Sequence, residues 1–288
     1  MTNVQSVDTQ AASAKTPLLE VRNLTVRFSK KGAPAVDDVS FAIARGETLG
    51  LVGESGSGKT TIGRAILGLQ PVTSGQILFE GRDITKTSAS QRRSLQGDLR
   101  AVFQDPFSSL NPRRPIGDAI TEPLRVAGVS REERDARAKV VLDAVGLAPG
   151  SEARYPRQFS GGQRQRIAIA RALVTDPRLV VCDEAVSALD LSTQAQVLNL
   201  LSDLREGKDL GYLFIAHDMA VVEFLAQRVI VLNRGRLVEE GLTTDVIRNP
   251  QHHYTRTLMA ASPVPDPDEQ ARRREAWKQL RAEAKAAA

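Results

Sequence analysis

The stretch at residues 47–69, ETLGLVGESGSGKTTIGRAILGL, decides the fold of this chain. It begins with a short, mostly apolar run that predicts a buried strand, and it ends in a pattern typical of a helix. The eight residues between them fill every defined position of the motif G-x-x-x-x-G-K-[ST]. These residues are Gly53, Glu54, Ser55, Gly56, Ser57, Gly58, Lys59 and Thr60. A strand before the loop and a helix after it form the context that this motif requires.

Residues 53–60, called the phosphate loop below, have the chemistry of a polyphosphate site. Glycines let the backbone curl so that successive N–H groups face phosphate oxygens, and the helix that follows adds the positive end of its dipole. We expect Lys59 to reach the β- and γ-phosphates and the Thr60 hydroxyl to ligate Mg²⁺. Together with Thr61, the loop is the expected nucleotide contact.

A second motif, LVVCDE at residues 179–184, ends an apolar strand in two adjacent carboxylates. Two acids at a strand end are more often solvated charges than catalytic groups, and the phosphate loop is what favours the catalytic interpretation. We expect Asp183 to reach the Mg²⁺ shell and Glu184 to polarise an attacking water. Cys182, between Val181 and Asp183, is expected to be an inert buried thiol.

A third motif, FSGGQ at residues 159–163, opens a predicted helix that runs to residue 174. Ser160 stands at the N-cap position, and Gly161 and Gly162 leave backbone N–H groups bare. The residues alone leave two alternatives open, a second anion site or a simple helix cap.

The remaining patterns predict an α/β fold. Alternating apolar residues at 19–28 and 39–43 indicate a small N-terminal antiparallel β-subdomain. Strands at 75–79, 99–103, 179–183, 213–216 and 229–232 alternate with helices, which predicts a mostly parallel sheet around the phosphate loop. Residues 105–175 form an inserted α-helical subdomain, in which Ser130 and Glu133 predict a capping box. Residues 1–17 are expected to be a loose tail.

Composition excludes several classes of protein. The chain has 288 residues and a net charge of +5, too small over this length to indicate nucleic acid as a partner. Its single cysteine excludes an internal disulfide or a cysteine-held metal cluster. No apolar run approaches the ~20 residues of a membrane span, and the first residues lack the pattern of a secretory signal. We therefore expect a cytosolic chain that touches a membrane only through a partner.

Over residues 18–250 the sequence resembles the ATP-binding-cassette (ABC) ATPases. The phosphate loop and the paired acids match, and SGGQ at 160–163, including Gln163, resembles the signature sequence, with Phe159 where Leu is usual. The resemblance also implies an ATP hydrolase with Mg²⁺ as cofactor, in which the signature turn of a second subunit completes each ATP site. Ala185 and Val186 depart from the usual Pro-Thr after the acids and leave both carboxylates in place.

The same resemblance assigns expected roles to four further residues. Gln104 corresponds to the metal-contacting and coupling glutamine, and His217 to the switch histidine that contacts the γ-phosphate. Asp190 ends the Ser187–Asp190 loop that crosses to the opposite subunit. Phe28 is the candidate aromatic that stacks on adenine, although an aromatic in a strand is more often part of a core.

Three segments, at residues 103–113, 194–201 and 249–263, resemble the oligopeptide/dipeptide importer branch, which includes nickel importers. His253 stands where that branch usually has Pro, and the chain lacks the cysteine cluster of some members, so no iron–sulfur cluster is expected. Residues 251–288 would form the branch's C-terminal extension.

The branch implies a peptide importer ATPase on the cytoplasmic face of the membrane. Its partners would be a second ATPase subunit, favoured as a paralogue in a heterodimer, two permease subunits and an extracytoplasmic solute-binding protein. An importer of nickel or another small solute, a soluble ABC-type ATPase and a non-catalytic ATP-binding spacer remain alternatives. Glu184 and His217 argue against the spacer.

Overall fold

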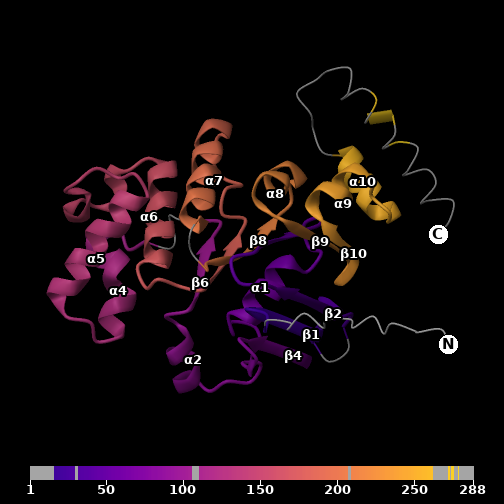
Figure 1. Cartoon of the computed structure of the whole chain (residues 1–288), viewed down its shortest axis with the longest axis horizontal. Coiled ribbons are helices and arrows are strands. Elements are labelled where there is room, and N and C mark those ends of the chain that lie inside the picture. The colour runs from indigo at the N-terminus through magenta and orange to yellow at the C-terminus, as the bar shows by residue number, and fades with distance from the viewer. Residues whose placement is uncertain are drawn as a thin grey trace, which may run out of the picture.

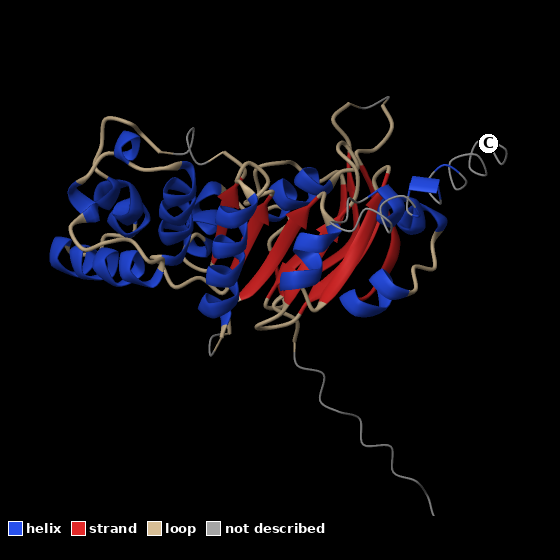
Figure 2. Cartoon of the chain, turned by 90° about the horizontal axis from the view of Figure 1, so that it is seen from above, coloured by secondary structure: helices blue, strands red, loops and turns tan. Residues whose placement is uncertain are grey.

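The computed structural model describes residues 16–29, 32–105, 110–206 and 209–261, together with residues 272, 274, 275 and 278. The expected tail up to residue 15 and nearly all of the expected extension beyond residue 261 lie outside the described residues. Within the described part, the strands form one four-stranded and one six-stranded sheet. Helices pack on the larger sheet, and a helical block lies at one end of the molecule (Figures 1 and 2).

The smaller sheet is antiparallel, as predicted. Its order is β2-β1-β4-β5, with β1 at Leu19–Val26, β2 at Val36–Ile43, β4 at Ser74–Phe79 and β5 at Arg82–Asp83. Alternate side chains of β1 and β2 are buried, which is the pattern of a sheet with one face in a core. The expectation that the strand extends to Phe28 was wrong, because β1 ends at Val26 and Phe28 is 70% exposed.

The larger sheet has the order β10-β9-β3-β8-β7-β6. Its strands are β3 (Thr48–Val52), β6 (Leu99–Phe103), β7 (Leu179–Asp183), β8 (Gly211–Ala216), β9 (Arg228–Asn233) and β10 (Arg236–Leu242). All pairs are parallel except β9 with β10, which a tight turn at Arg234 and Gly235 connects. Both of those residues have positive φ, as such a turn requires. Because β3, β7 and β8 are parallel neighbours, their carboxyl ends meet at one edge.

The core lies on both faces of this sheet. Val181 of β7 packs into a cluster with the antiparallel sheet and α1 (Lys59–Ile66), while Val180 and Cys182 pack into a second cluster on the other face. Around that second face lie α6 (Gly161–Leu173), α7 (Leu191–Arg205), α8 (Met219–Leu225), α9 (Thr243–Arg248) and α10 (His253–Ala261). Among the described residues, no helix combines the length and apolar character that a membrane crossing needs.

The helical block consists of α4 (Ile116–Val126), α5 (Arg131–Ala144) and α6, with two short 3-10 turns at Ser151–Ala153 and Pro156–Gln158. Ser130 caps α5 as predicted, but only half of the capping box forms. The Ser130 hydroxyl accepts the N–H of Glu133, whereas the Glu133 carboxylate accepts from Arg137 at 2.6 Å. An ion pair one turn along the helix thus takes the side chain that the box would use.

Candidate functional site

The phosphate loop is wedged between two other segments, which explains two of its glycines. A Cβ at Gly53 would overlap the carbonyl oxygen of Leu232 at the end of β9. A Cβ at Gly58 would overlap the carbonyl oxygen of Ala35, and Gly58 has a φ of 108°, which L-residues rarely adopt. The loop therefore has its shape only with glycine at these positions.

The loop offers a cluster of free N–H donors. The N–H group of Ser57 donates to the carbonyl of Glu54 at 3.2 Å. Within the described residues, the N–H groups of residues 55, 56 and 59–61 have no acceptor. They sit at the N-terminus of α1, where the helix dipole is positive. This arrangement suits the oxygens of a phosphate chain.

Lys59 is buried inside this loop, with 4% of its surface exposed. Its ammonium donates to the carbonyl oxygens of Gly53 at 2.7 Å and Glu54 at 2.8 Å. Burial lowers the pKa of Lys59, while the carboxylates of Glu184, Asp183 and Glu54 oppose that shift. The ammonium is thus held in the loop by groups that an anionic ligand could replace.

Asp183 and Thr60 bring two oxygens together at the end of β7. The Thr60 hydroxyl donates to Asp183 Oδ1 at 3.0 Å, and Asp183 is only 8% exposed. Burial raises the pKa of Asp183, and the hydrogen bond from Thr60 counters part of that shift. A hydroxyl and a carboxylate side by side are hard oxygen donors, so these residues fit Mg²⁺.

Glu184 and His217 meet because their strands are neighbours. Glu184 follows β7 in a left-handed conformation with φ of 50°, and its N–H donates to the carbonyl of Ile215 in β8 at 3.0 Å. His217 follows β8, and its Nδ1 lies 3.7 Å from Glu184 Oε1. The pair stands beside the phosphate loop with the carboxylate able to accept a proton from water.

A cavity of about 880 Å³ joins the loop, the paired acids and Gln104. Gln104 follows β6, and its side-chain amide donates to the Ser187 hydroxyl at 3.2 Å. The cavity is lined by Ser55, Thr60, Arg64, Leu69, Phe103, Gln104, Asp105, Asp183 and Glu184.

The SGGQ turn does not share this cavity. It forms a complete capping box, in which Ser160 Oγ accepts the N–H of Gln163 at 3.3 Å and the Gln163 side chain accepts the N–H of Ser160 at 3.0 Å. Ser160 and Gln163 are exposed, and Gly161 lines a separate cavity of about 250 Å³ beyond Gln104. Within one chain, the turn is therefore a well-formed helix start on the surface.

Two other expected residues also lie away from the cavity. Asp190 caps α7, and hydrogen bonds from the N–H and hydroxyl of Thr193 lower its pKa. Phe28 lies just after the end of β1, and Ala35, which precedes β2, lies against Gly58 of the phosphate loop. The ring of Phe28 is exposed and is not part of the hydrophobic core.

Tyr254 is a contact that the sequence did not reveal. Its hydroxyl accepts a hydrogen bond from the N–H of Glu54 at 2.9 Å, across 200 residues of chain. Because Tyr254 is far from the loop in the sequence, its contact with Glu54 can be seen only once α10 is packed in the folded chain.

Comparison with known proteins identifies the family. Residues 36–187 match the family model described as ABC transporter, and residues 238–288 match the model described as oligopeptide/dipeptide transporter, C-terminal region. A Brucella ovis protein named "Putative peptide import ATP-binding protein" is 52% identical to this chain, and the match covers 88% of this chain and 81% of the relative. The glutathione import ATP-binding protein GsiA of Shigella dysenteriae is 51% identical over 88% of this chain, which spans only 42% of GsiA.

Two solved structures share the fold. CbiO1 of Clostridium perfringens, described as part of the ABC transporter complex cbiONQ, has a TM-score of 0.75 and 25% identity, covering 81% of this chain and 92% of its own. The ATP-binding cassette MJ0796, solved as a dimer in a post-hydrolysis state with ADP and Pi, has a TM-score of 0.70 and 28% identity, covering 78% and 98%. With the loop and paired acids in place, the chain belongs to the ABC transporter family as one of its ATP-hydrolysing subunits.

Proposed function

We propose that this chain energises the import of di- or oligopeptides across the cytoplasmic membrane. The observation that carries the proposal is the match of residues 238–288 to the oligopeptide/dipeptide transporter model, joined to an intact nucleotide cavity. The names of the relatives, peptide import and glutathione import ATP-binding proteins, support it.

In this proposal the chain's own residues bind and orient ATP. The N–H groups of residues 55, 56 and 59–61 hold phosphate oxygens, and the Lys59 ammonium exchanges the carbonyls of Gly53 and Glu54 for the β- and γ-phosphates. Thr60, Asp183 and Gln104, which line the same cavity, would hold Mg²⁺. When bound, Mg²⁺ neutralises charge on the β- and γ-phosphates.

Glu184 acts as the base in the same proposal. Its carboxylate accepts a proton from the attacking water, and the backbone bond to Ile215 keeps it at the end of β7. His217, 3.7 Å from that carboxylate, contacts the γ-phosphate. General-base assistance contributes about 10²–10⁴-fold to a rate, so the proposal assigns that factor to one residue.

A second cassette completes the site. The exposed Ser160 turn presents bare N–H groups on the surface and lies outside the cavity of its own chain. This placement supports a contact between the turn and the nucleotide that a neighbouring cassette binds. ATP would then hold two cassettes together, and loss of the γ-phosphate would let them separate. Asp190 and Phe28, both on the surface, would contact the opposite subunit and adenine respectively. We favour a paralogue as the second cassette.

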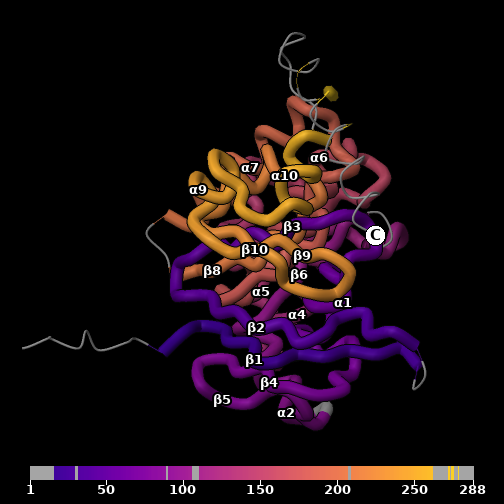
Figure 3. Tube along the Cα trace, turned by 90° about the vertical axis from the view of Figure 1, so that its right-hand side faces the viewer, coloured from indigo at the N-terminus to yellow at the C-terminus, as the bar shows by residue number. Residues whose placement is uncertain are grey.

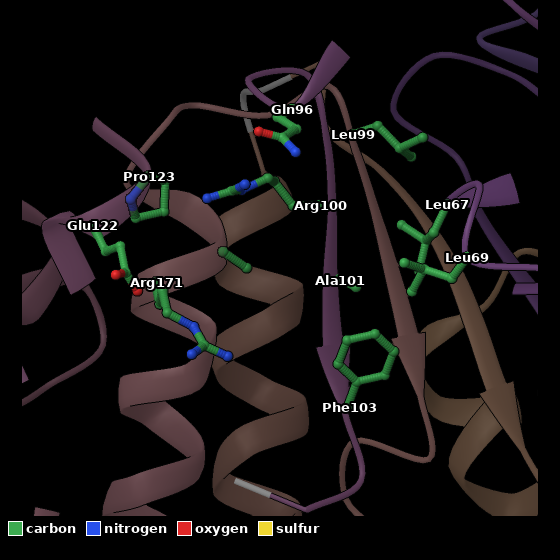
Figure 4. Close-up of a pocket in the computed structure, with 11 residues that line it drawn as sticks. Leu67, Leu69, Gln96, Leu99, Arg100, Ala101, Phe103, Glu122, Pro123 and Arg171 are labelled. Atoms are coloured by element: carbon green, nitrogen blue, oxygen red, sulfur yellow. The ribbon is translucent and has the colours of Figure 1, made fainter. Parts of the chain in front are cut away.

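The permease partners would dock on the groove beside β6. A cavity of about 330 Å³ lies there, with Arg100, Arg171 and Glu122 on the side of the helical block and Leu67 and Leu69 across the strand (Figure 4). Burial lowers the pKa of both arginines. Because β6 leads directly to Gln104, contact in this groove can be coupled to the nucleotide. The partners would be two permease subunits and an extracytoplasmic solute-binding protein, and the chain would lie on the cytoplasmic face of the membrane.

The test uses the complex purified with its membrane partners and reconstituted with a solute-binding protein. Glu184→Gln should retain ATP binding and lower ATP turnover and peptide uptake at least 100-fold. The control is Glu132→Gln, an exposed carboxylate on α5 far from the cavity. Wild-type turnover in Glu184→Gln would refute the base, and uptake of a metal ion in place of peptides would refute the substrate class.

Mixed dimers test the shared site. Lys59→Ala in one cassette and Ser160→Arg in the other should damage the same nucleotide site and spare the second, whereas both changes in one cassette should damage both. Equal impairment in either arrangement would contradict sharing.

A further inference from the structure

The C-terminal helix α10 contacts the phosphate loop through one side chain. The hydroxyl of Tyr254 accepts a hydrogen bond from the backbone N–H of Glu54 at 2.9 Å. Tyr254 is half-buried and packs against the main hydrophobic cluster. It lies outside residues 36–187, the segment that matches the ABC transporter model. The nucleotide loop therefore has a contact from the oligopeptide-type C-terminal region.

With this contact, both polar groups of the peptide between Gly53 and Glu54 have hydrogen-bond partners. The carbonyl oxygen of Gly53 accepts from the Lys59 ammonium at 2.7 Å, and the N–H of the same peptide, that of Glu54, donates to Tyr254. Glycine permits backbone rotations that other residues resist, so the peptide after Gly53 is free to rotate unless it is held. Rotation of this peptide would break both hydrogen bonds.

Tyr254 reaches the loop from a firmly anchored element. The carboxylate of Glu239 in β10 accepts the N–H groups of Gln251 at 2.7 Å and His252 at 3.0 Å, just before α10 begins. Although burial pushes the pKa of Glu239 upward, these hydrogen bonds contribute to holding it below its usual value. The N–H of Tyr254 itself donates to His252 Nδ1 at 3.1 Å, and Leu258 is buried in the core. Helix α10 lies next to α9 above β9 and β10 (Figure 3).

We propose that Tyr254 is a positioning residue of the nucleotide site. Its hydroxyl keeps the Gly53–Glu54 peptide in the orientation that leaves the other loop N–H groups converged on the phosphates. The Glu54 N–H is already used by Tyr254, so in this proposal the phosphates take the other loop N–H groups, those of residues 55, 56 and 59–61. When nucleotide draws Lys59 away from Gly53, Tyr254 is the bond that remains. Docking of α10 and ATP binding then favour each other reciprocally.

The experiment replaces Tyr254 by phenylalanine in the full chain, which keeps the ring and removes the hydroxyl. Loss of one hydrogen bond should weaken ATP and ADP binding roughly 3- to 10-fold. In the assembled transporter KM should rise by a similar factor while kcat changes less than about two-fold. Amide exchange at Glu54 should accelerate. The control is Tyr212→Phe, because the buried Tyr212 hydroxyl has no hydrogen-bond partner among the described residues.

Each result decides the matter. Unchanged nucleotide affinity in Tyr254→Phe would assign the ring a packing role only, and tighter binding would make the hydroxyl a competitor of phosphate; either overturns the proposal. If the variant unfolds, the unaltered chain still provides the test: saturating ADP should slow amide exchange across α10, and unchanged exchange there would overturn the coupling. The readout is nucleotide affinity, so it does not depend on which solute is imported.

Discussion

The buried charge of Asp183 should destabilise the nucleotide-free chain. Burial raises the pKa of its carboxyl, the charge of Glu184 adds to the rise, and only the hydrogen bond from Thr60 and two more distant cations oppose it. A pKa raised in the folded state means that the folded chain holds this proton more tightly than the unfolded chain does. The contribution of Asp183 to stability is therefore present at low pH and is lost as the pH rises through the folded pKa.

Asp183→Asn removes the charge and keeps an oxygen that can accept from Thr60. Without nucleotide at pH 7 we expect a gain of about 1 kcal/mol, the order of magnitude of one poorly compensated buried polar group. For a chain of this size that is a rise in Tm of about 2 °C. With Mg-ATP at 100 times Kd the wild type should gain about 2.7 kcal/mol, most of which the variant forgoes, so the order of stability reverses.

Calorimetry at pH 7 and pH 4, with and without Mg-ATP, measures these four values. The matched control is Asp190→Asn, because hydrogen bonds from Thr193 lower the pKa of Asp190, and its replacement should therefore not raise Tm at pH 7. If Asp183→Asn melts below the wild type without nucleotide at pH 7, or if its gain is as large at pH 4, the assignment of an uncompensated charge is refuted.

Three further outcomes follow from the site. Burial raises the pKa of Cys182 to about 12, so the thiol should resist alkylation at pH 8 in the native chain and react fully in denaturant, as mass spectrometry of labelled chain would show; rapid native labelling contradicts this. Phe28→Ala should leave Tm within about 1 °C, because the ring is exposed, yet weaken ATP binding several-fold by calorimetric titration; unchanged affinity would remove Phe28 from the site. Gly58→Ala should abolish ATP binding, measured by equilibrium dialysis, since its Cβ meets the Ala35 carbonyl at a φ that alanine resists. Wild-type affinity in that variant would show that the loop relaxes around the added atom.

Much of the fold follows from short-range patterns. The strand, phosphate loop and helix at residues 47–69 appear where predicted, although α1 begins at Lys59 and ends at Ile66. Ser160 caps α6 as expected because an N-cap depends on residues within one helical turn. The helix α2 (Ala89–Leu95) was missed although Ser88 and Gln91 form a capping box, so a local signal for it existed.

Other features required the folded chain. Phe28 continues an alternating pattern, yet β1 ends two residues earlier because its partner β2 begins its pairing at Val36. The hairpin of β9 and β10 carries a turn signal at Arg234 and Gly235, but its strand β10 is mostly half-exposed and shows weak alternation. His253 begins α10 at the position where the resemblance expects Pro, and the first helical residue is where proline fits.

By itself, the sequence determined the identity of the phosphate loop, the acids at the end of β7 and the cap at Ser160. Each depends on residues within a few positions, where backbone conformation and hydrogen bonding are local. Only the tertiary structure decided that Glu184 meets His217 and that Tyr254 holds Glu54. Those contacts depend on the strand order of the central sheet and on where α10 buries its apolar side, and both result from burying whole faces at once.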